Sequence, residues 1–132
     1  MFIRIIICTV LFAIMDGVWF TFFMNDFAIS KIAPILNLEE NLLSVRFFEA
    51  FMAYALMVIS AVFFLDSKTS ISKNYFESFM WGALLGICIF GVFDFTNGAL
   101  MKTYPLSFII VDTLWGGFMY GIAAISMKKL SS

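Results

Sequence analysis

Four long apolar stretches constrain the fold of this chain more than any other feature of its sequence. They cover about residues 3–24, 44–65, 76–101 and 106–127, and each reaches the roughly 20 apolar residues that a helix needs to cross a bilayer. Hydrophobic residues make up 63% of the 132 residues and the mean hydropathy is +1.02, whereas soluble domains have about 45–50% apolar residues. We therefore predict one all-α domain, residues 1–132, built as an integral membrane bundle of four transmembrane helices.

The connections between these stretches are polar and mostly short. The longest is "NDFAISKIAPILNLEEN", in which "FAISKIAPIL" has the character of a short amphipathic turn or helix at the membrane interface, interrupted at Pro34. The second connection, "DSKTSISKN", is typical of a polar loop. The third, "KTYP", predicts a tight turn, with Pro105 opening the last helix.

The charged and reactive residues exclude several classes of function. The formal net charge is −1 without a basic cluster, so nucleic acid is not an expected partner. The chain has no histidine, which argues against a classical catalytic zinc site and excludes Ser-His or Cys-His nucleophiles. Cys8 and Cys88 both lie in apolar stretches without a cysteine partner at metal-ligand spacing, and we expect reduced, inert thiols.

The distribution of basic residues predicts the orientation in the membrane. Four spans place both termini on one side, and five basic residues fall on that side against three on the other. The positive-inside rule therefore favours cytoplasmic termini. The five are Arg4, Lys68, Lys73, Lys128 and Lys129, and the three are Lys31, Arg46 and Lys102.

Four acidic residues interrupt the apolar stretches, one in each span. They are Asp16, Glu49, Asp94 and Asp112. At about 1.5 Å of rise per residue, all four lie about 8–12 Å from the same membrane face. An ionised carboxylate at the centre of a spanning helix costs about 2.5–3.5 kcal/mol even on a lenient scale. We expect these groups to face one another, water, a cation or an arginine, or else to hold protons.

Further polar residues fall at the same depth. Thr96 and Asn97 follow Asp94 in "FDFTNG". Arg46 lies three residues before Glu49, so that the two side chains are within ion-pair reach on one helix face. We predict that Thr96, Asn97 and Arg46 belong to the same substrate-binding or ion-binding layer as the four acids.

Two tryptophans share a spacing relative to these acids. Trp19 follows Asp16 in "DGVW" and Trp115 follows Asp112 in "DTLW", each at a separation of three residues that places both side chains on one helix face. A lone tryptophan near a membrane interface is more often an aromatic-belt residue. The repeated spacing favours a second interpretation, in which Trp19 and Trp115 form a pocket wall.

Several ligands suit a layer of carboxylates without histidine. Oxygen-rich ligation favours a divalent cation such as Mg²⁺, Ca²⁺ or Mn²⁺, or a monovalent cation. Clustered carboxylates also bind protons, as a proton-coupled carrier requires. A cationic organic substrate held by an aspartate and stacked on tryptophan is a third option.

Packing signals suggest close helix contacts and a partner. Gly82 and Gly86, and Gly117 and Gly121, are spaced so that a neighbouring helix can approach closely. The acids also recur in both helical hairpins, which raises the alternative of two pseudo-repeated hairpins. A single bundle of four helices leaves little room for a transport pathway of its own. We therefore expect a homo-oligomer or a partner membrane subunit, in addition to the lipid bilayer.

The motifs around the acids resemble a known family. The stretches "DGVWF", "FFEAFMAYAL" and "GALLGICIFGVFDFTNGALMKTYPLSFIIVDTLWG" are similar to four-span bacterial membrane proteins filed as domain of unknown function twenty-one seventy-seven. The most specific part reads here as Asp94, Phe95, Thr96 and Asn97, then Tyr104 and Pro105, then Val111, Asp112, Trp115 and Gly116. Phe93 stands where a tyrosine often precedes the aspartate, and Tyr104 where a tryptophan is common. The resemblance implies the architecture and a bacterial inner membrane, and it implies no established activity.

Three functions remain open at this point. The leading hypothesis is that the carboxylate layer binds and translocates a proton, a metal cation or a small cationic substrate. The alternatives are an accessory or scaffold subunit, in which the polar layer joins helices, and a membrane enzyme acting on a lipid or isoprenoid head group, with Asp94 or Asp112 as a general base. The inventory of residues favours a protein that is not an enzyme.

Overall fold

Four long helices make up most of the protein, because a backbone surrounded by hydrocarbon must satisfy its own N–H and C=O groups. The computed structural model describes residues 1–32, 38–39, 42–43 and 46–131. Four helical stretches are long and apolar enough to span a bilayer, namely Phe2–Phe23, Phe47–Ile71, Tyr75–Leu100 and Leu106–Ser131. The predicted all-α bundle of four transmembrane helices is confirmed, and a lipid bilayer is its environment.

The first span is not a uniform α-helix. Helix α1 (Phe2–Val18) passes into the π-helical segment η1 (Trp19–Met24), which continues into α2 (Asn25–Ile32). Aromatic and β-branched residues such as those in "WFTFF" are weak α-helix formers, and π-helical insertions occur often at functional sites. Helix α2 covers the first part of the stretch predicted to form a short turn or helix, its interfacial position stays a prediction, and the predicted interruption at Pro34 lies outside the described residues.

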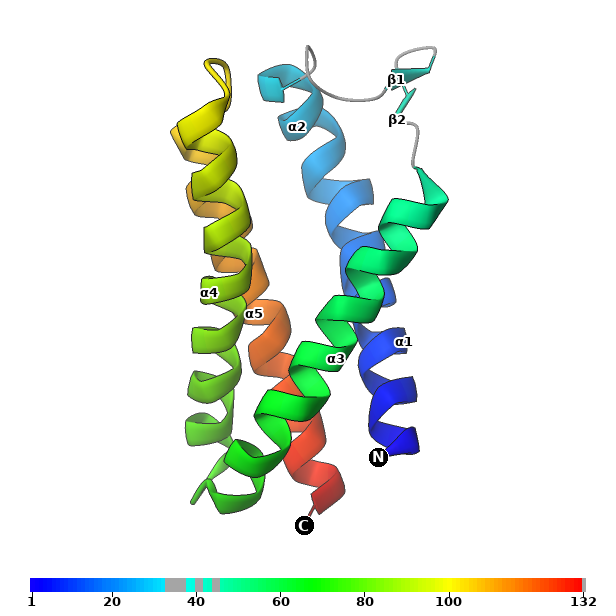
Figure 1. Cartoon of the computed structure of the whole chain (residues 1–132), viewed down its shortest axis with the longest axis vertical. Helices are drawn as coiled ribbons and strands as arrows, with labels where there is room; N and C mark the ends of the chain where they lie inside the picture. Colours follow the sequence, from blue (N-terminus) through cyan, green and yellow to red (C-terminus); the bar gives the residue numbers. More distant parts are fainter. Residues whose placement is uncertain (33–37, 40–41, 44–45, 132) are drawn as a thin grey trace.

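Two short antiparallel strands follow α2. Strand β1 (Leu38–Glu39) pairs with β2 (Leu42–Leu43), with Leu38 opposite Leu43. Both lie at the end of the bundle that also holds α2 and the turn between α4 and α5, which we call the upper end. The lower end holds both chain termini and the loop between α3 and α4 (Figure 1).

The other three spans are α3 (Phe47–Ile71), α4 (Tyr75–Leu100) and α5 (Leu106–Ser131). Helix α5 begins directly after Pro105, as predicted. The prediction of a polar loop after residue 65 is wrong over most of its length, since α3 continues to Ile71. The predicted start of that span at residue 44 lies outside the described residues.

Polar groups explain why α3 extends so far. The Ser72 hydroxyl donates to the Lys68 carbonyl at 2.6 Å, and the Lys128 ammonium donates to the carbonyls of Thr69 and Ser72 at 3.4 and 2.6 Å. These contacts satisfy carbonyls at the end of the helix, which would otherwise lack partners. The residues "DSKTSI" therefore form a polar final turn and a half of helix.

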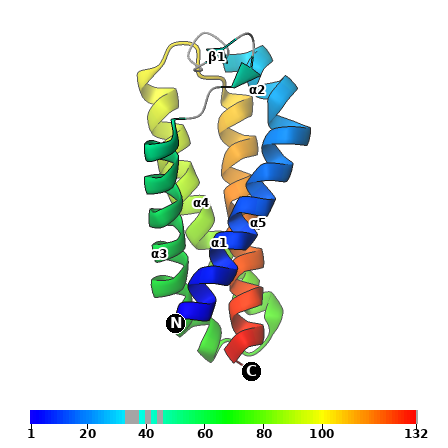
Figure 2. The ribbon, with the colours of Figure 1, turned by 90° about the vertical axis from the view of Figure 1, so that its right-hand side faces the viewer.

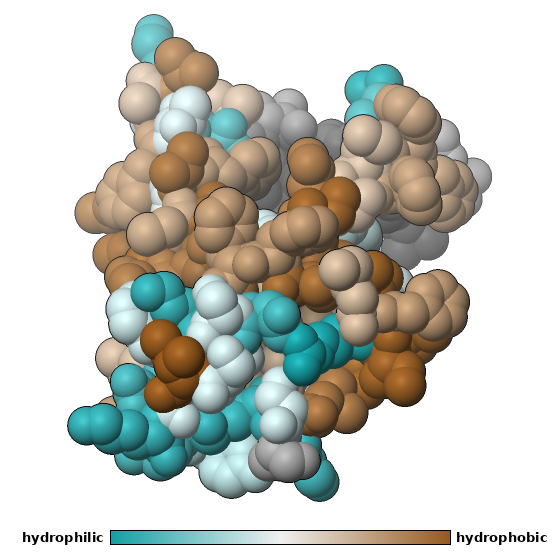
Figure 3. All heavy atoms as spheres, turned by 60° about the horizontal axis from the view of Figure 1, so that its bottom comes forward, coloured by the Kyte–Doolittle hydropathy of each residue, from teal (hydrophilic) through white to brown (hydrophobic). Residues whose placement is uncertain are grey.

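An ion pair joins three helices at the lower end. Arg4 on α1 forms an ion pair with Asp66 on α3 and donates to the Ser131 hydroxyl on α5 at 2.7 Å. Figure 3 shows polar residues gathered over the lower end and apolar residues covering the adjoining flank. This distribution matches a bundle whose lower end meets water and whose sides meet lipid.

Helices α4 and α5 pack with their backbones in close contact, while α1 lies against α5 and α3 (Figure 2). A Cβ atom on Gly82 would collide with the Tyr120 carbonyl, and a Cβ atom on Gly86 would collide with the Gly116 carbonyl. The glycines of the predicted small-residue spacings therefore lie at a helix interface. The main hydrophobic core of the bundle contains Cys8, Phe12, Val58, Ala61, Val62, Leu65, Met119, Tyr120, Ala123, Ala124 and Met127.

The two hairpins of the bundle differ in their packing. The buried residues of α3 all lie between Val58 and Thr69, so its upper half, Phe47–Met57, contributes none. In Figure 1, α3 is inclined and its upper part leads away from α4. The hypothesis of two pseudo-repeated hairpins stays a prediction.

We expect Gly86→Ala to destabilise the bundle by about 1–3 kcal/mol, the usual effect of overpacking. The reason is that the new methyl group would meet backbone atoms of Gly116, which cannot move aside without separating α4 from α5. Thermal unfolding in detergent micelles measures the change.

Gly17→Ala is the matched control, since a Cβ atom there meets nothing within 4 Å. In a helix this substitution is expected to be neutral or to stabilise by about 0.5–1 kcal/mol. Equal unfolding temperatures for the two variants would contradict the assignment of Gly86 to a close backbone contact.

Candidate functional site

A cluster of three aspartates lies in the upper half of the bundle, where α1, α4 and α5 meet. Asp94 on α4 is fully buried, Asp16 on α1 is 8% exposed, and Asp112 on α5 is half-buried. The close packing of α4 on α5 brings Asp94 next to Asp112 and Thr113, 18 and 19 residues further along the chain. We call Asp16, Asp94 and Asp112 the aspartate cluster.

Asp94 is held by hydroxyl groups from α5 and from the turn before it. The Tyr104 hydroxyl donates to Asp94 Oδ1 at 2.9 Å, and the Thr113 hydroxyl donates to Oδ2 at 3.4 Å. Asp112, the residue before Thr113 on α5, lies close to Asp94 and interacts with it electrostatically. Each Asp94 oxygen thus has a partner, as a buried carboxyl group requires.

Asp16 is held from two other helices. The Tyr54 hydroxyl on α3 donates to Asp16 Oδ2 at 2.6 Å, and the Trp115 indole N–H on α5 donates to Oδ1 at 3.4 Å. Asp112 is close enough to Asp16 for their charges to interact. The three carboxyl groups therefore form one electrostatic unit that joins all four spans.

The two tryptophans stack on each other beside the cluster. The ring centroids of Trp19 and Trp115 are 4.6 Å apart with an interplanar angle of 8°, and Phe23 stacks on Trp19 at 5.4 Å. The Trp19 indole N–H lies near Asp112 but makes no hydrogen bond of good geometry within the described residues. Trp19 is buried among these rings, with 8% of its surface exposed.

The remaining predicted site residues are placed differently. Asn97 is half-buried and lies against the Tyr104 hydroxyl, at the edge of the cluster, whereas Thr96 is exposed on α4. Glu49 and Arg46 form an ion pair with each other at the start of α3, with their side chains 50% and 71% exposed. The structure does not bring Glu49, Arg46 or Thr96 to the aspartate cluster, and the binding role of all these residues stays a prediction.

The sequence analysis missed three hydroxyl donors. Tyr54, Tyr104 and Thr113 were not among the predicted site residues, yet they supply most of the hydrogen bonds to the cluster. A signal was present for two of them, because Thr113 directly follows Asp112 and Tyr54 is a polar-tipped residue inside an apolar span. Tyr104 lies in the turn, where nothing in the local pattern points back to Asp94.

No cation lies among the partners of the cluster in the part of the chain that the structure describes. Arg4 pairs with Asp66, Arg46 pairs with Glu49, and Lys68 lies over the Trp81 ring at 4.5 Å. The described residues also contain no group of three His, Cys, Asp or Glu side chains placed to hold a metal ion. The observed partners of the carboxyl groups are hydroxyl and indole donors and one another.

Tyr104 lies outside the spans, in the turn between α4 and α5. Burial raises the pKa of its hydroxyl above the ordinary value, Asn97 opposes this shift, and the hydrogen bond to Asp94 adds to it. The Tyr104 hydroxyl therefore keeps its proton at physiological pH and acts as a donor to Asp94.

The chain matches the family model of the predicted membrane proteins DUF2177 over residues 1–127. The chain belongs to this family. The match includes the aspartate cluster and its hydroxyl donors, so the site lies within the family's own domain. No curated protein and no solved structure matches the chain. Membership of DUF2177 confirms the resemblance and the membrane architecture and assigns no activity.

Tyr104→Phe should destabilise this DUF2177 protein by about 1–3 kcal/mol, because Asp94 Oδ1 loses its hydroxyl donor while staying buried. Thermal unfolding at neutral pH measures the change. Tyr75→Phe is the matched control, since Tyr75 is 48% exposed at the lower end, and we expect it to change stability by less than about 0.5 kcal/mol. Equal effects of the two substitutions would contradict a supporting role of Tyr104 at the cluster.

Proposed function

We propose that the aspartate cluster is an intramembrane proton-binding site, in which Asp94 and Asp112 share one proton and release it reversibly. The observation that carries the proposal is that these two carboxyl groups lie close together where α4 packs on α5, and that no cation is among their partners in the described residues. Two ionised carboxylates at such a distance repel strongly in a medium of low polarity. One proton between them removes the repulsion and makes one carboxyl group a donor to the other.

The geometry favours a proton over a metal cation. Oxygen-ligated cations such as Ca²⁺ take six to eight ligands, and Mg²⁺ requires a nearly octahedral set. Of the oxygen atoms at the cluster, both on Asp94 and one on Asp16 already accept hydrogen bonds from hydroxyl groups. The described residues contain no group of three His, Cys, Asp or Glu side chains placed to hold a metal ion, whereas a shared proton needs only two neighbouring carboxyl groups.

The same geometry argues against an organic cation stacked on tryptophan. Cation–π binding needs an open aromatic face within about 6 Å of the cation. Trp19 is only 8% exposed and stacks on both Trp115 and Phe23, which leaves no open face for a cation. The predicted pocket wall is therefore better described as a packed aromatic stack that shields the carboxyl groups.

The cluster exchanges its proton at the upper end in this proposal. Asp112 is only half-buried and Tyr104 lies in the turn at that end, while the core of Phe12, Met119 and Tyr120 fills the bundle below. We further propose a bacterial inner membrane location with both termini cytoplasmic, supported by the excess of basic residues at the lower end. The cluster would then face the outer half of the membrane.

Infrared difference spectroscopy in nanodiscs tests proton binding directly. We expect a carboxylic-acid C=O band at neutral pH that shifts in D₂O and disappears reversibly when the pH is raised. Asp94→Asn and Asp112→Asn should each abolish this band. Asp26→Asn, at an exposed aspartate on α2, is the matched control and should leave the band unchanged. A protein whose carboxyl groups are all ionised at neutral pH would rule the proposal out.

Proteoliposomes containing a pH-sensitive dye separate transport from binding alone. Translocation predicts proton flux under a membrane potential that is lost in Asp112→Asn and retained in Asp26→Asn. The accessory-subunit alternative predicts instead that Asp94→Asn and Asp112→Asn impair folding or assembly, with flux equal to that of protein-free vesicles in every case. Circular dichroism and size-exclusion chromatography of the same samples detect that outcome.

A further inference from the structure

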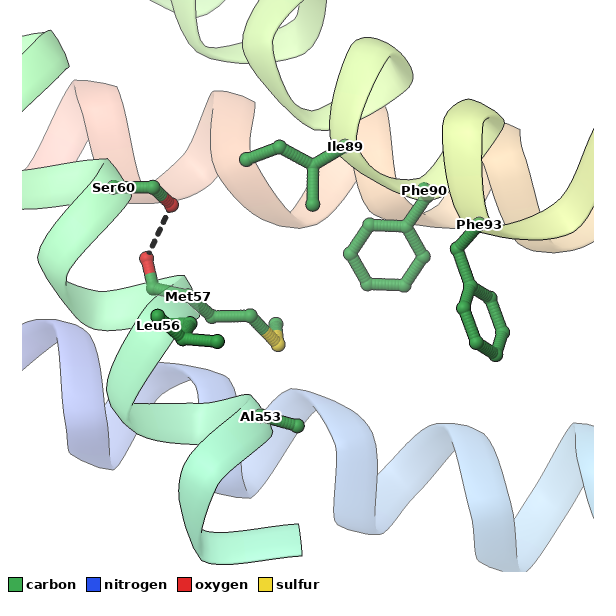
Figure 4. A pocket seen from close by; sticks show the side chains of 7 residues that line it. All are labelled: Ala53, Leu56, Met57, Ser60, Ile89, Phe90 and Phe93. Atoms are coloured by element: carbon green, nitrogen blue, oxygen red, sulfur yellow. Dashed lines mark hydrogen bonds between the residues drawn. The ribbon is translucent and has the colours of Figure 1, made fainter. Parts of the chain in front are cut away.

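An apolar groove lies between α3 and α4, on the flank of the bundle that faces lipid. Its volume is about 570 Å³, within the range of about 300–1,000 Å³ typical of ligand sites. Figure 4 shows side chains from both helices pointing into it; they are Ala53, Leu56, Met57 and Ser60 of α3 and Ile89, Phe90 and Phe93 of α4. Leu56 is 62% exposed and Phe93 is 60% exposed, so the groove opens sideways into the bilayer.

The polar atoms along the groove already have hydrogen-bond partners within the protein, so they do not require a polar ligand. The groove's one hydroxyl group, on Ser60, donates to the Met57 carbonyl at 2.8 Å and lies 2.8 Å from the Tyr120 hydroxyl. The Tyr120 hydroxyl in turn lies 3.1 Å from the same carbonyl. Because these polar atoms satisfy one another, the natural occupant of the groove is a hydrocarbon chain.

The groove narrows toward the lower end and opens toward the upper end. Below Val58 the helix α3 is packed into the core, whereas none of its residues from Phe47 to Met57 is buried. A chain that enters this groove therefore comes from the upper leaflet, with its free end near Ser60.

A pair of opposite charges lies on α3 about one and two helical turns before Ala53, toward the upper end. Arg46, Glu49, Ala53, Met57 and Ser60 follow one another at helical spacings of three or four residues, so they form one stripe along α3. Arg46 caps the helix at the membrane interface, and its ion pair with Glu49 is largely exposed. Neither charge is used by the aspartate cluster.

The length of the stripe matches one leaflet. Arg46 and Ser60 are 14 positions apart, about 21 Å along the helix axis, and one leaflet contributes about 15 Å of hydrocarbon to the bilayer. Because α3 is inclined, the depth that it spans is smaller than its length. A single acyl chain can reach from the level of Arg46 to the end of the groove.

We propose that this groove and the Arg46–Glu49 pair form a binding site for an amine-bearing zwitterionic phospholipid of the upper leaflet. One acyl chain lies between α3 and α4, the phosphate accepts hydrogen bonds from the Arg46 guanidinium, and the cationic amine faces Glu49. The site is separate from the proposed proton-binding function, and either stands without the other.

Native mass spectrometry of the full chain tests this proposal. The protein is extracted from nanodiscs that contain equal amounts of phosphatidylethanolamine and phosphatidylglycerol with a small share of diacylglycerol. We expect one retained phosphatidylethanolamine per chain. Preferential retention of phosphatidylglycerol, retention of diacylglycerol, retention of a second protein chain instead of lipid, or retention of nothing would each overturn the proposal.

Two matched pairs of variants locate the bound lipid. Ala53→Trp fills the groove and should reduce retention at least about tenfold, the change that corresponds to about 1.4 kcal/mol. Ala99→Trp, at an exposed position on another face of α4, should retain the lipid. Arg46→Gln should reduce retention of phosphatidylethanolamine, whereas Lys102→Gln, at an exposed cation of the same end, should not.

Measurement of unfolding temperature shows whether each variant is folded. Equal retention by Ala53→Trp and Ala99→Trp, or by Arg46→Gln and Lys102→Gln, with all four variants folded, would overturn the proposed site. If Ala53→Trp fails to fold, Leu56→Trp fills the groove from an exposed position and provides the same comparison.

Discussion

The close contact between the backbones of α4 and α5 is the interaction on which the rest of the structure depends. It exists because Gly82 and Gly86 leave no side chain between α4 and the carbonyls of Tyr120 and Gly116. At this separation Asp94 comes within reach of Thr113 and Asp112. Helix α1 then packs on α5 and adds Asp16 and Trp19. The aspartate cluster therefore depends on the contact between α4 and α5, which lies closer to the lower end.

A carboxyl group without hydrogen-bond partners raises the free energy of a protein in a bilayer, and this explains which residues surround the cluster. Soluble proteins commonly offset such groups with arginine or lysine, but none of the cations in the described part of this chain is a hydrogen-bond or ion-pair partner of the aspartates in the cluster. The aspartates are instead held by Tyr54, Tyr104, Thr113 and Trp115. Neutral donors leave the net charge of the cluster uncompensated, and this is the physical reason for proposing that it holds a proton.

The sequence allowed the four spans to be predicted well, because hydrophobic length is a local property. It also placed Asp16, Asp94 and Asp112 at one depth, since in short hairpins depth follows from counting residues. Counting residues does not reveal which way a helix face points or where a helix leaves the bundle. Glu49 was assigned to the same layer by depth, but the upper half of α3 diverges and Glu49 pairs with Arg46 at the surface.

Long-range partners were the part that sequence patterns could not supply. Tyr54 meets Asp16 across 38 residues and Trp115 meets it across 99, and neither separation leaves a periodic signal. The spacing between aspartate and tryptophan did mark the right residues, although the structure pairs each tryptophan with an aspartate of the other helix. Trp115 donates to Asp16 and Trp19 lies near Asp112. The tryptophan of each motif therefore lies next to the aspartate of the motif on the other helix, α1 or α5.

The groove and the aspartate cluster share two helices, and this connects the two proposals physically. Ala53 and Phe93 line the groove, and their neighbours in sequence, Tyr54 and Asp94, belong to the network of the cluster. A hydrocarbon chain in the groove keeps water from the outer side of these helical turns, and a medium of low polarity strengthens hydrogen bonds while it penalises separated charges. Lipid in the groove therefore favours the state in which Asp94 and Asp112 share their proton, and water in its place favours release of that proton. Under the two proposals, the divergence of α3 that leaves the groove open thus couples the charge state of the buried cluster to the lipid in the groove.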